Sequence, residues 1–316
     1  MGKDHLIDVH HHILPPNYVE IVGDDRIGPL ILAGKTPEWS PQQSIEAMDR
    51  NGIQTAITSI SAPGLWFGNN QETIDLCRYC NEFATKMRGD HAGRFGVFAG
   101  LPLPDVDASL QEIAYAFDEL GCDGIGLLTS YGNRYPGDLE FNPVFEELNK
   151  RHATVYFHPT NAPCSQCQPE IPAATLDFPF DTTRAVVSLL FNGTFTRCKN
   201  INFIFSHAGG TIPFLAERIA RLQSRPGFKD HVPNGVIPEL KRLYYDTALS
   251  TNWLAFRSLL ELTEPDHVLF GSDYPFAPEQ TMTGSIKQLQ SMGLEPEILE
   301  GIERNHALKL FPQFQS

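Results

Sequence analysis

Short apolar runs alternate with longer segments of helical periodicity along the whole chain. The runs are rich in β-branched and aromatic residues, and in the segments between them apolar residues recur every three or four positions. We expect strands at Leu6–His10, Gln54–Ile60, Phe95–Gly100, Gly124–Leu128, Thr154–His158, Asn202–Ser206, Leu243–Asp246 and His267–Phe270. We expect helices at Pro41–Asn51, Gln71–Arg88, Asp107–Leu120, Asn142–Arg151, Thr182–Leu190, Ile212–Leu222, Trp253–Glu261 and Thr283–Met292. Eight strand–helix pairs predict the α/β class and a parallel (β/α)8 TIM barrel.

Local signals mark several of the predicted helix ends. Ser40 stands before a proline and is a candidate N-cap, and residues Asp107–Ser109 offer another cap. Gly52, Gly121 and Gly293 follow apolar helical stretches as stops. These signals support the alternating reading.

The length of 316 residues suits one barrel with long loops, because such barrels usually take about 250 residues. Three proline-rich, irregular segments lie at about 15–39, 160–181 and 225–239. The strand–helix rhythm resumes after each one, so we interpret them as loops that shape a site. We therefore expect a single domain over residues 1–316.

The charge balance excludes several classes of partner. The chain has 24 Lys and Arg against 38 Asp and Glu, a net charge of −14, which argues against a nucleic-acid or anionic-membrane surface. No apolar run approaches the roughly 18 residues of a membrane span. The first residues contain no secretory signal, so we expect a cytoplasmic protein.

Two C-x-x-C pairs, Cys77/Cys80 and Cys164/Cys167, allow a zinc ribbon or a redox pair. The pairs are too far apart for a ribbon, and Cys77/Cys80 falls in a predicted helix. We expect reduced structural thiols instead.

Ionisable side chains collect where predicted strands end. The carboxyl ends of barrel strands converge on one face, so residues far apart in sequence meet there. These residues are His10, His12, His158, His207 and Asp273. Three neutral imidazoles and a carboxylate predict a divalent metal site, with zinc as first candidate and manganese or iron also possible.

The H-x-H spacing suits one ion, because residues two apart in an extended chain point the same way, and His11 then points away. Taken singly, His158 could be a hydrogen-bonded core residue and Asp273 a helix cap. Four apolar strands, however, each place an ionisable side chain at the same end of the barrel. Burial of such side chains is costly unless they bind a metal or act in catalysis.

The order H-x-H, FHP, SHAGG, GSDYPF resembles the metal-dependent amidohydrolase superfamily over residues 6–311. Within it, the sequence resembles the branch of aminocarboxymuconate semialdehyde decarboxylase and the salicylate-type decarboxylases. Segments 61–64, 156–163, 206–215, 244–252 and 268–278 look most like 6-methylsalicylate decarboxylases.

This resemblance implies that His10, His12, His158 and Asp273 ligate the metal and that His207 acts beside a metal-bound water. It implies a single ion, because the fourth strand ends without the lysine of two-metal relatives. It also implies a homodimer, in which Arg218 reaches the partner's site. Without the resemblance, we would interpret Arg218 as an ordinary charged residue on the solvent-facing side of a helix.

One stretch departs from the family pattern. The semialdehyde decarboxylases keep an arginine for a substrate carboxylate in the helix after W-x-P, whereas residues 39–49 here read WSPQQSIEAMD and contain none. The departure favours a substrate with one carboxylate.

The reaction that we prefer is non-oxidative decarboxylation of an ortho-hydroxybenzoate such as 6-methylsalicylate. The carboxylate and phenol oxygens would chelate the metal, and Asp273 or the metal water that it touches would protonate the ring carbon, with His207 orienting and recharging the acid. Trp66, Phe67 and Phe276 could hold the ring, although loop packing explains each of them equally well.

Two alternatives use the same residues. A hydrolase of a lactone, ester or cyclic amide, or a hydratase, would use the metal-bound water as nucleophile, with Asp273 as base. A metal-binding or scaffolding protein would keep the barrel without chemistry, but the presence of both His207 and Asp273 argues against it.

Overall fold

The computed structural model describes residues 5–161 and 170–315. Its centre is one parallel sheet in which each strand pairs with the next in the sequence, from β1 through β8. The strands are β1 Leu6–His12, β2 Ile53–Ser59, β3 Phe95–Ala99, β4 Gly124–Leu128, β5 Thr154–His158, β6 Asn202–Phe205, β7 Tyr244–Asp246 and β8 Val268–Leu269. All eight coincide with predicted strands, with ends that differ by two residues at most.

The segment after β8 brings the last strand back to the first. The Val9 amide donates to the Phe270 carbonyl at 3.0 Å, and the His12 amide donates to the Tyr274 carbonyl at 2.7 Å. The Asp273 amide in turn donates to the His10 carbonyl at 2.8 Å. These bonds nearly close the sheet, and the predicted TIM barrel is confirmed.

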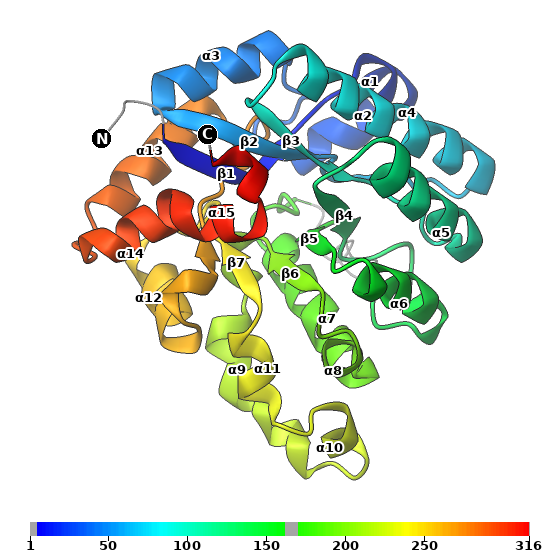
Figure 1. Ribbon diagram of the computed structural model, residues 1–316, viewed down its shortest axis with the longest axis vertical. Coiled ribbons are helices and arrows are strands. Elements are labelled where there is room, and N and C mark those ends of the chain that lie inside the picture. Colours follow the sequence, from blue (N-terminus) through cyan, green and yellow to red (C-terminus); the bar gives the residue numbers. More distant parts are fainter. Residues whose placement is uncertain (1–4, 162–169, 316) are drawn as a thin grey trace.

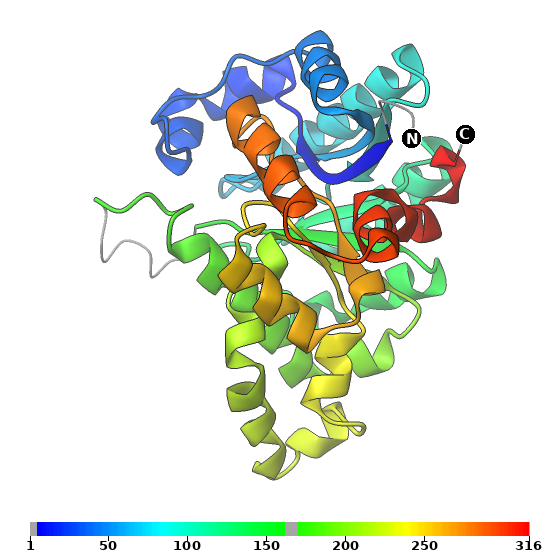
Figure 2. The same ribbon diagram turned by 90° about the vertical axis from the view of Figure 1, so that its left-hand side faces the viewer.

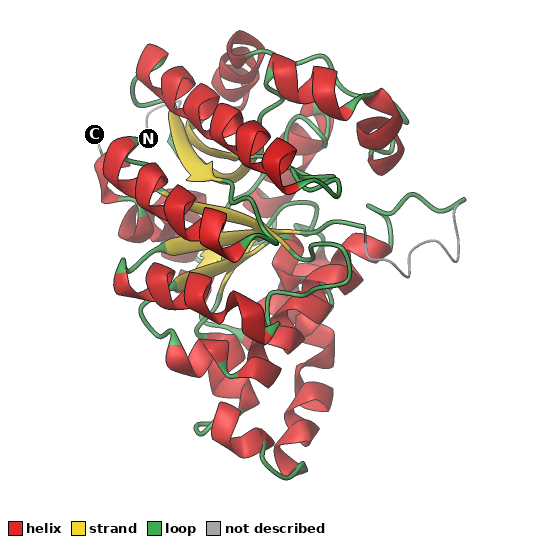
Figure 3. Ribbon diagram, turned by 90° about the vertical axis from the view of Figure 1, so that its right-hand side faces the viewer, coloured by secondary structure: helices red, strands yellow, loops and turns green. Residues whose placement is uncertain are grey.

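Helices surround the sheet as an outer layer (Figures 1 and 3). They are α1 Pro16–Val22, α2 Asp24–Ile27, α3 Pro41–Asn51, α4 Asn70–Asp90, α5 Val106–Ala114, α6 Asn142–Lys150, α7 Asp177–Asn192, α8 Thr194–Arg197, α9 Ile212–Ala220, α10 Phe228–His231, α11 Val236–Lys241, α12 Trp253–Leu262, α13 Glu279–Gln290, α14 Pro296–Glu300 and α15 His306–Leu310. Each predicted helix is present in this set, and α5 continues into a π-helical turn, Tyr115–Glu119.

The helix-end signals are borne out except for one cap. The Ser40 side chain accepts from the Gln43 amide at the start of α3, and Gly52 ends that helix in the left-handed conformation. The cap expected within residues Asp107–Ser109 is wrong, because Asp105 accepts the Ala108 amide instead. The helix begins earlier than the apolar period suggested.

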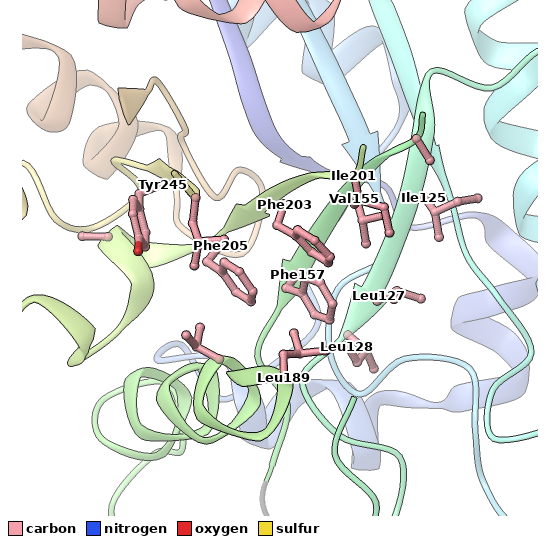
Figure 4. Packing of buried hydrophobic residues seen from close by; sticks show 14 of the residues in the cluster. Ile125, Leu127, Leu128, Val155, Phe157, Leu189, Ile201, Phe203, Phe205 and Tyr245 are labelled. Atoms are coloured by element: carbon pink, nitrogen blue, oxygen red, sulfur yellow. The ribbon is translucent and has the colours of Figure 1, made fainter. Parts of the chain in front are cut away.

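Side chains alternate between the two faces of the barrel strands. Phe157, Phe203 and Phe205 project outward and pack near Leu189 of α7 (Figure 4). Side chains from several strands meet inside the barrel, and residues of the C-terminal segment pack against them at the end opposite the carboxyl ends of the strands. This interior cluster contains Ile7, Val9, Ile57, Phe98, Tyr156, Ile204, Leu269, Ala307, Phe311 and Phe314. The interior is therefore filled below the carboxyl ends of the strands, and those ends remain available for polar groups.

The long loops contain short helices. Segment 15–39 forms α1 and α2, and segment 225–239 includes α10 and α11, which extend from one end of the molecule beside α9 (Figures 1 and 2). No helix in the described ranges is both long and apolar enough to cross a lipid bilayer.

Cys77, Cys80, Cys122 and Cys198 are free and buried, in agreement with the prediction of reduced thiols. Burial raises the pKa of Cys122 to about 11, which keeps this thiol protonated at neutral pH. The second pair, Cys164/Cys167, lies outside the described residues.

Candidate metal centre

Three histidines and an aspartate meet at the carboxyl ends of the strands. His10 and His12 come from β1, His158 is the last residue of β5, and Asp273 follows β8. Their ligand atoms all lie within 4.8 Å of one another, and all four residues are buried. The structure therefore brings together the four residues predicted to hold a metal.

One carboxylate oxygen forms the centre of this group. Asp273 Oδ1 lies 3.2 Å from His10 Nε2, 3.2 Å from His12 Nε2 and 3.9 Å from His158 Nε2. The Nε2 atoms of His10 and His12 are 3.0 Å apart. Three imidazole nitrogens from β1 and β5 thus surround one carboxylate oxygen of the segment that follows β8.

The opposite ring nitrogens fix the direction of the imidazole lone pairs. His10 Nδ1 lies 2.8 Å from Asp246 Oδ2, His158 Nδ1 lies 2.8 Å from the Pro159 carbonyl, and His12 Nδ1 lies 3.3 Å from the Ser59 carbonyl. Each Nδ1 therefore carries a proton and donates it, as the ligands of protein-bound metals usually do.

The donor set fits a cation. The three Nε2 atoms converge on Asp273 Oδ1, and without an ion only the one extra proton that His10 carries lies among these four acceptor atoms. Acceptors that face one another without a donor are costly when buried. A divalent ion at this point would satisfy all of them with the nitrogen and oxygen ligands that zinc and manganese accept.

Electrostatics keep most of the site in its ligating form before any ion binds. Burial lowers the pKa of His12 to about 4 and holds that of His158 well below its usual value. Burial by itself would raise the pKa of Asp273, but the adjacent His10 outweighs it and holds that pKa well below the usual range. Burial also lowers the pKa of His10, but Asp246 and Asp273 together raise it to about 10. Binding of a cation would displace this one proton.

A β-bulge aims the two histidines of β1. Pairing with β2 runs from Asp8 opposite Ala56 to His11 opposite Thr58, so β1 contains one extra residue over this stretch. Val9 faces the barrel interior below the bulge, and His10, its neighbour, turns toward the site above it. The extra residue shifts the alternation by one, as bulges near active sites often do.

The side chains on the other face of β1 tie the strand to the closing segment. Asp8 Oδ1 accepts the amides of His10 and Ser272, each at 3.0 Å, and Oδ2 accepts Ser272 Oγ at 2.5 Å. His11 Nδ1 lies 3.0 Å from Asp8 Oδ2, and His11 Nε2 lies 3.0 Å from Ser44 Oγ. His11 thus points away from the site, as predicted.

His207 lies beside the group of four. Its Nε2 is 3.5 Å from Asp273 Oδ2, the carboxylate oxygen that does not face the other histidines. Both residues have left-handed backbones, with φ of 53° at His207 and 64° at Asp273. Non-glycine residues rarely adopt this conformation, and such strain tends to collect at functional sites. The His207 amide is held at 2.9 Å by Asp246 Oδ1.

Two cavities open above these residues. One has a volume of about 210 Å³ and is bounded by Asp273 and His158 and by mostly apolar side chains. Its lining residues are Leu30, Ile31, Leu32, Ser61, Ala62, His158, Ala174, Phe178, Leu249, Asp273, Phe276, Ala277, Pro278 and Thr281. The other, also about 210 Å³, lies beside His207 and shares Ala174, Phe178, Leu249 and Asp273 with the first. No lysine or arginine lines either cavity within the described residues.

Of the four residues predicted to contact the substrate, one lines the first cavity and the others line neither cavity. Phe276 lines the first cavity, and its ring meets that of His12 edge-on at 5.4 Å between centroids. Trp66 and Phe67 line neither cavity, and the Arg26 guanidinium lies 4.7 Å from the Phe67 ring centroid. Arg218 is exposed near the end of α9. The structure therefore brings Phe276 alone of these four to the cavity wall.

Asp246 was missed by the sequence reasoning. It is fully buried at the end of β7 and contacts both His10 and His207. The available signal was its position, since it ends a predicted strand as His158 does. Asp8 was missed too, although it stands two residues before the H-x-H motif.

Comparison with known proteins agrees with this geometry. A family model described as amidohydrolase matches residues 7–313. The chain is 36% identical to decarboxylase yanB of Aspergillus niger, over 98% of this chain and 88% of that protein. It is 34% identical to 6-methylsalicylic acid decarboxylase of Penicillium expansum, over 98% of this chain and 97% of that protein.

A solved structure extends the likeness of fold. It is the dihydroxybenzoic acid decarboxylase of Polaromonas sp. JS666, which contains bound manganese and the inhibitor 2-nitroresorcinol. The two chains superpose with a TM-score of 0.83 over 99% of this chain and 98% of the other, at 20% sequence identity.

Proposed function

This chain belongs to the amidohydrolase family, and from that premise we propose that it is a metal-dependent, non-oxidative decarboxylase of a small aromatic acid. The substrate is an ortho-hydroxybenzoate of the 6-methylsalicylate kind. The metal ligands are His10, His12, His158 and Asp273, and His207 acts together with Asp273 in catalysis.

One observation carries the proposal. Three imidazole Nε2 atoms converge on Asp273 Oδ1 directly beside a mostly apolar cavity whose described lining contains no lysine or arginine. A substrate carboxylate in that cavity would meet no arginine or lysine of those residues, so the ion is the group that would neutralise it. The ring would lie among apolar and aromatic side chains, of which Phe276 is one.

A bound divalent ion would supply a Lewis acid that the carboxylate and the neighbouring phenol oxygen can chelate together. The residues of the chain supply the proton. Asp273 Oδ2 faces His207 Nε2 at 3.5 Å, so a proton can be held between them and delivered to the ring carbon that bears the carboxylate. As the C–C bond then breaks, CO2 leaves, its bonding electrons restore the aromatic ring, and His207 recharges the acid.

We propose zinc as the resident ion, because three histidines and one carboxylate suit it, and manganese as the second candidate. The bound manganese of the Polaromonas decarboxylase supports the second choice. Elemental analysis of the purified protein distinguishes the two.

We further propose a cytoplasmic homodimer built from single-domain chains over residues 1–316. Helices α9 and α12 lie side by side and expose three large apolar side chains, Phe214 at 87%, Trp253 at 54% and Leu254 at 86%. Large apolar side chains that are exposed on neighbouring helices are typical of an interface. Arg218 is also on α9, and a second copy docked on this face would cover it.

Incubation of the metal-loaded protein with 6-methylsalicylate, followed by measurement of CO2 and the phenolic product, tests the proposed reaction. We expect equal amounts of both products and about one ion per chain. His158→Asn should lose the ion and the activity, whereas His152→Asn, at an exposed left-handed position near the same strand, should keep both.

The same assay addresses the competing reaction. Turnover of lactones, esters or cyclic amides without release of CO2 from hydroxybenzoates would refute the decarboxylase and favour the hydrolase that uses the same residues. The proposed substrate contact at Trp66 stays a prediction from the sequence, since this residue lines neither cavity.

A further inference from the structure

Leu249 has a backbone that does not suit its side chain. It lies in the loop after β7 with φ of 52°, in the left-handed region that leucine rarely enters. The turn is held by the Ser250 amide, which donates to the Thr247 carbonyl at 3.0 Å, and by the Ala248 amide, which donates to Asp246 Oδ1 at 3.0 Å. Glycine or asparagine would fit this turn with less strain.

Packing does not explain the leucine either. Its side chain is 45% exposed and belongs to none of the hydrophobic clusters formed by the described residues. A strained backbone combined with an exposed apolar side chain points to a use outside the core.

The position of Leu249 between two cavities indicates what its side chain does. Leu249 and Asp273 both line the cavity beside His158 and the cavity beside His207, so Leu249 stands at the boundary of the two. A substrate whose carboxylate lies at the metal site would place the adjacent ring position near Asp273. Leu249 is one of the side chains that a substituent at that position would meet, because it lines both cavities together with Asp273.

We propose that Leu249 is a specificity-determining residue, which favours an apolar group over a hydroxyl at the ring position beside the carboxylate. This inference rests on the proposed decarboxylase function. A hydroxyl in contact with an isobutyl group loses hydrogen bonds to water and gains none, whereas a methyl group gains apolar contact.

The test compares kcat/KM for 6-methylsalicylate with that for 2,6-dihydroxybenzoate. Leu249→Asn keeps the size of the side chain, tolerates the left-handed backbone and replaces the apolar surface with an amide. We expect the ratio of the two kcat/KM values to fall about tenfold in this variant. Leu139→Asn, the same change at a leucine that is 71% exposed and lines neither cavity, should leave the ratio unchanged.

Thermal unfolding separates a role in specificity from a role in structure. We expect Leu249→Asn and Leu249→Gly to melt no lower than the native protein, because the side chain is outside the core and both residues suit the turn. An unchanged ratio, or a drop in Tm like that of a buried leucine, would overturn the assignment of Leu249 while native decarboxylation stands. Absence of CO2 release from both substrates by the native protein would overturn the proposed function and this inference together.

Discussion

Replacement of Asp246 with asparagine should lower the affinity of the site for its metal, although Asp246 is not one of the proposed ligands. The two carboxylate oxygens of Asp246 accept three hydrogen bonds, from His10 Nδ1 at 2.8 Å, the His207 amide at 2.9 Å and the Ala248 amide at 3.0 Å. All three partners are donors. Asparagine has one acceptor oxygen and an NH2 group, so it cannot accept on both sides.

The cost falls on His10. If the amide oxygen stays with the two backbone amides, the NH2 group faces His10 Nδ1, which can accept only by moving its proton to Nε2. That proton occupies the lone pair with which His10 faces Asp273. Loss of such an orienting carboxylate lowers metal affinity about 10- to 100-fold, equivalent to about 1.4–2.7 kcal/mol.

The dissociation constant is measured by competition with a chelator, and CO2 release is then measured at saturating metal. The matched control is Asp266→Asn, which removes an aspartate 2.8 Å from His267 Nδ1 at a partly exposed site. We expect the control to change the dissociation constant less than twofold. We also expect Asp246→Asn to retain a lower kcat at saturation, because the same carboxylate holds the His207 amide. An unchanged dissociation constant in Asp246→Asn would show that this carboxylate does not set the tautomer of His10.

Three further predictions follow from the same geometry. His207→Ala should abolish CO2 release while elemental analysis still finds about one ion per chain, and full activity in this variant would remove His207 from the mechanism. Phe276→Ala should raise KM for 6-methylsalicylate about tenfold, a change of about 1.4 kcal/mol in binding, and should leave metal affinity unchanged, because the ring lines the cavity without ligating. The metal-free protein should lose stability as the pH falls from about 6.5 toward 4, because His12 and His158 stay neutral when folded and gain protons when unfolded. Chemical denaturation should show a loss of up to about 1.4 kcal/mol per pH unit for each histidine, and a flat profile over this window would mean that the two rings are not buried in the neutral form.

The strands and helices were predictable because their signals are local. The strand β5 and the helix α3 were each predicted with the bounds that the structure shows, and the cap at Ser40 is read from adjacent residues. The barrel as a whole followed from repetition of that pattern. The way in which the barrel closes could not be predicted, because β8 spans only Val268–Leu269 and the last contacts to β1 come from the irregular segment that follows.

The candidate metal site was predictable where position alone identifies a residue. His158 and Asp273 stand at strand ends, and the barrel brings such ends together whatever the loops do. Asp246 also ends a strand, but its role depends on which atom of His10 it faces, and those two residues are 236 positions apart. A carboxylate that binds an ion and one that orients a histidine look the same in a sequence.

The phase of β1 shows a deeper limit of periodicity. Alternation from Val9, which faces the barrel interior, would turn His10 and His12 away from the site and His11 toward it. The spacing of H-x-H states that His10 and His12 share a face but not which face that is. The bulge decides it, by inserting one residue between the pairs Asp8–Ala56 and His11–Thr58. Without the extra residue in β1, the same H-x-H motif would point at the surrounding helices. The metal site therefore depends on an irregularity of strand pairing that the H-x-H spacing does not reveal.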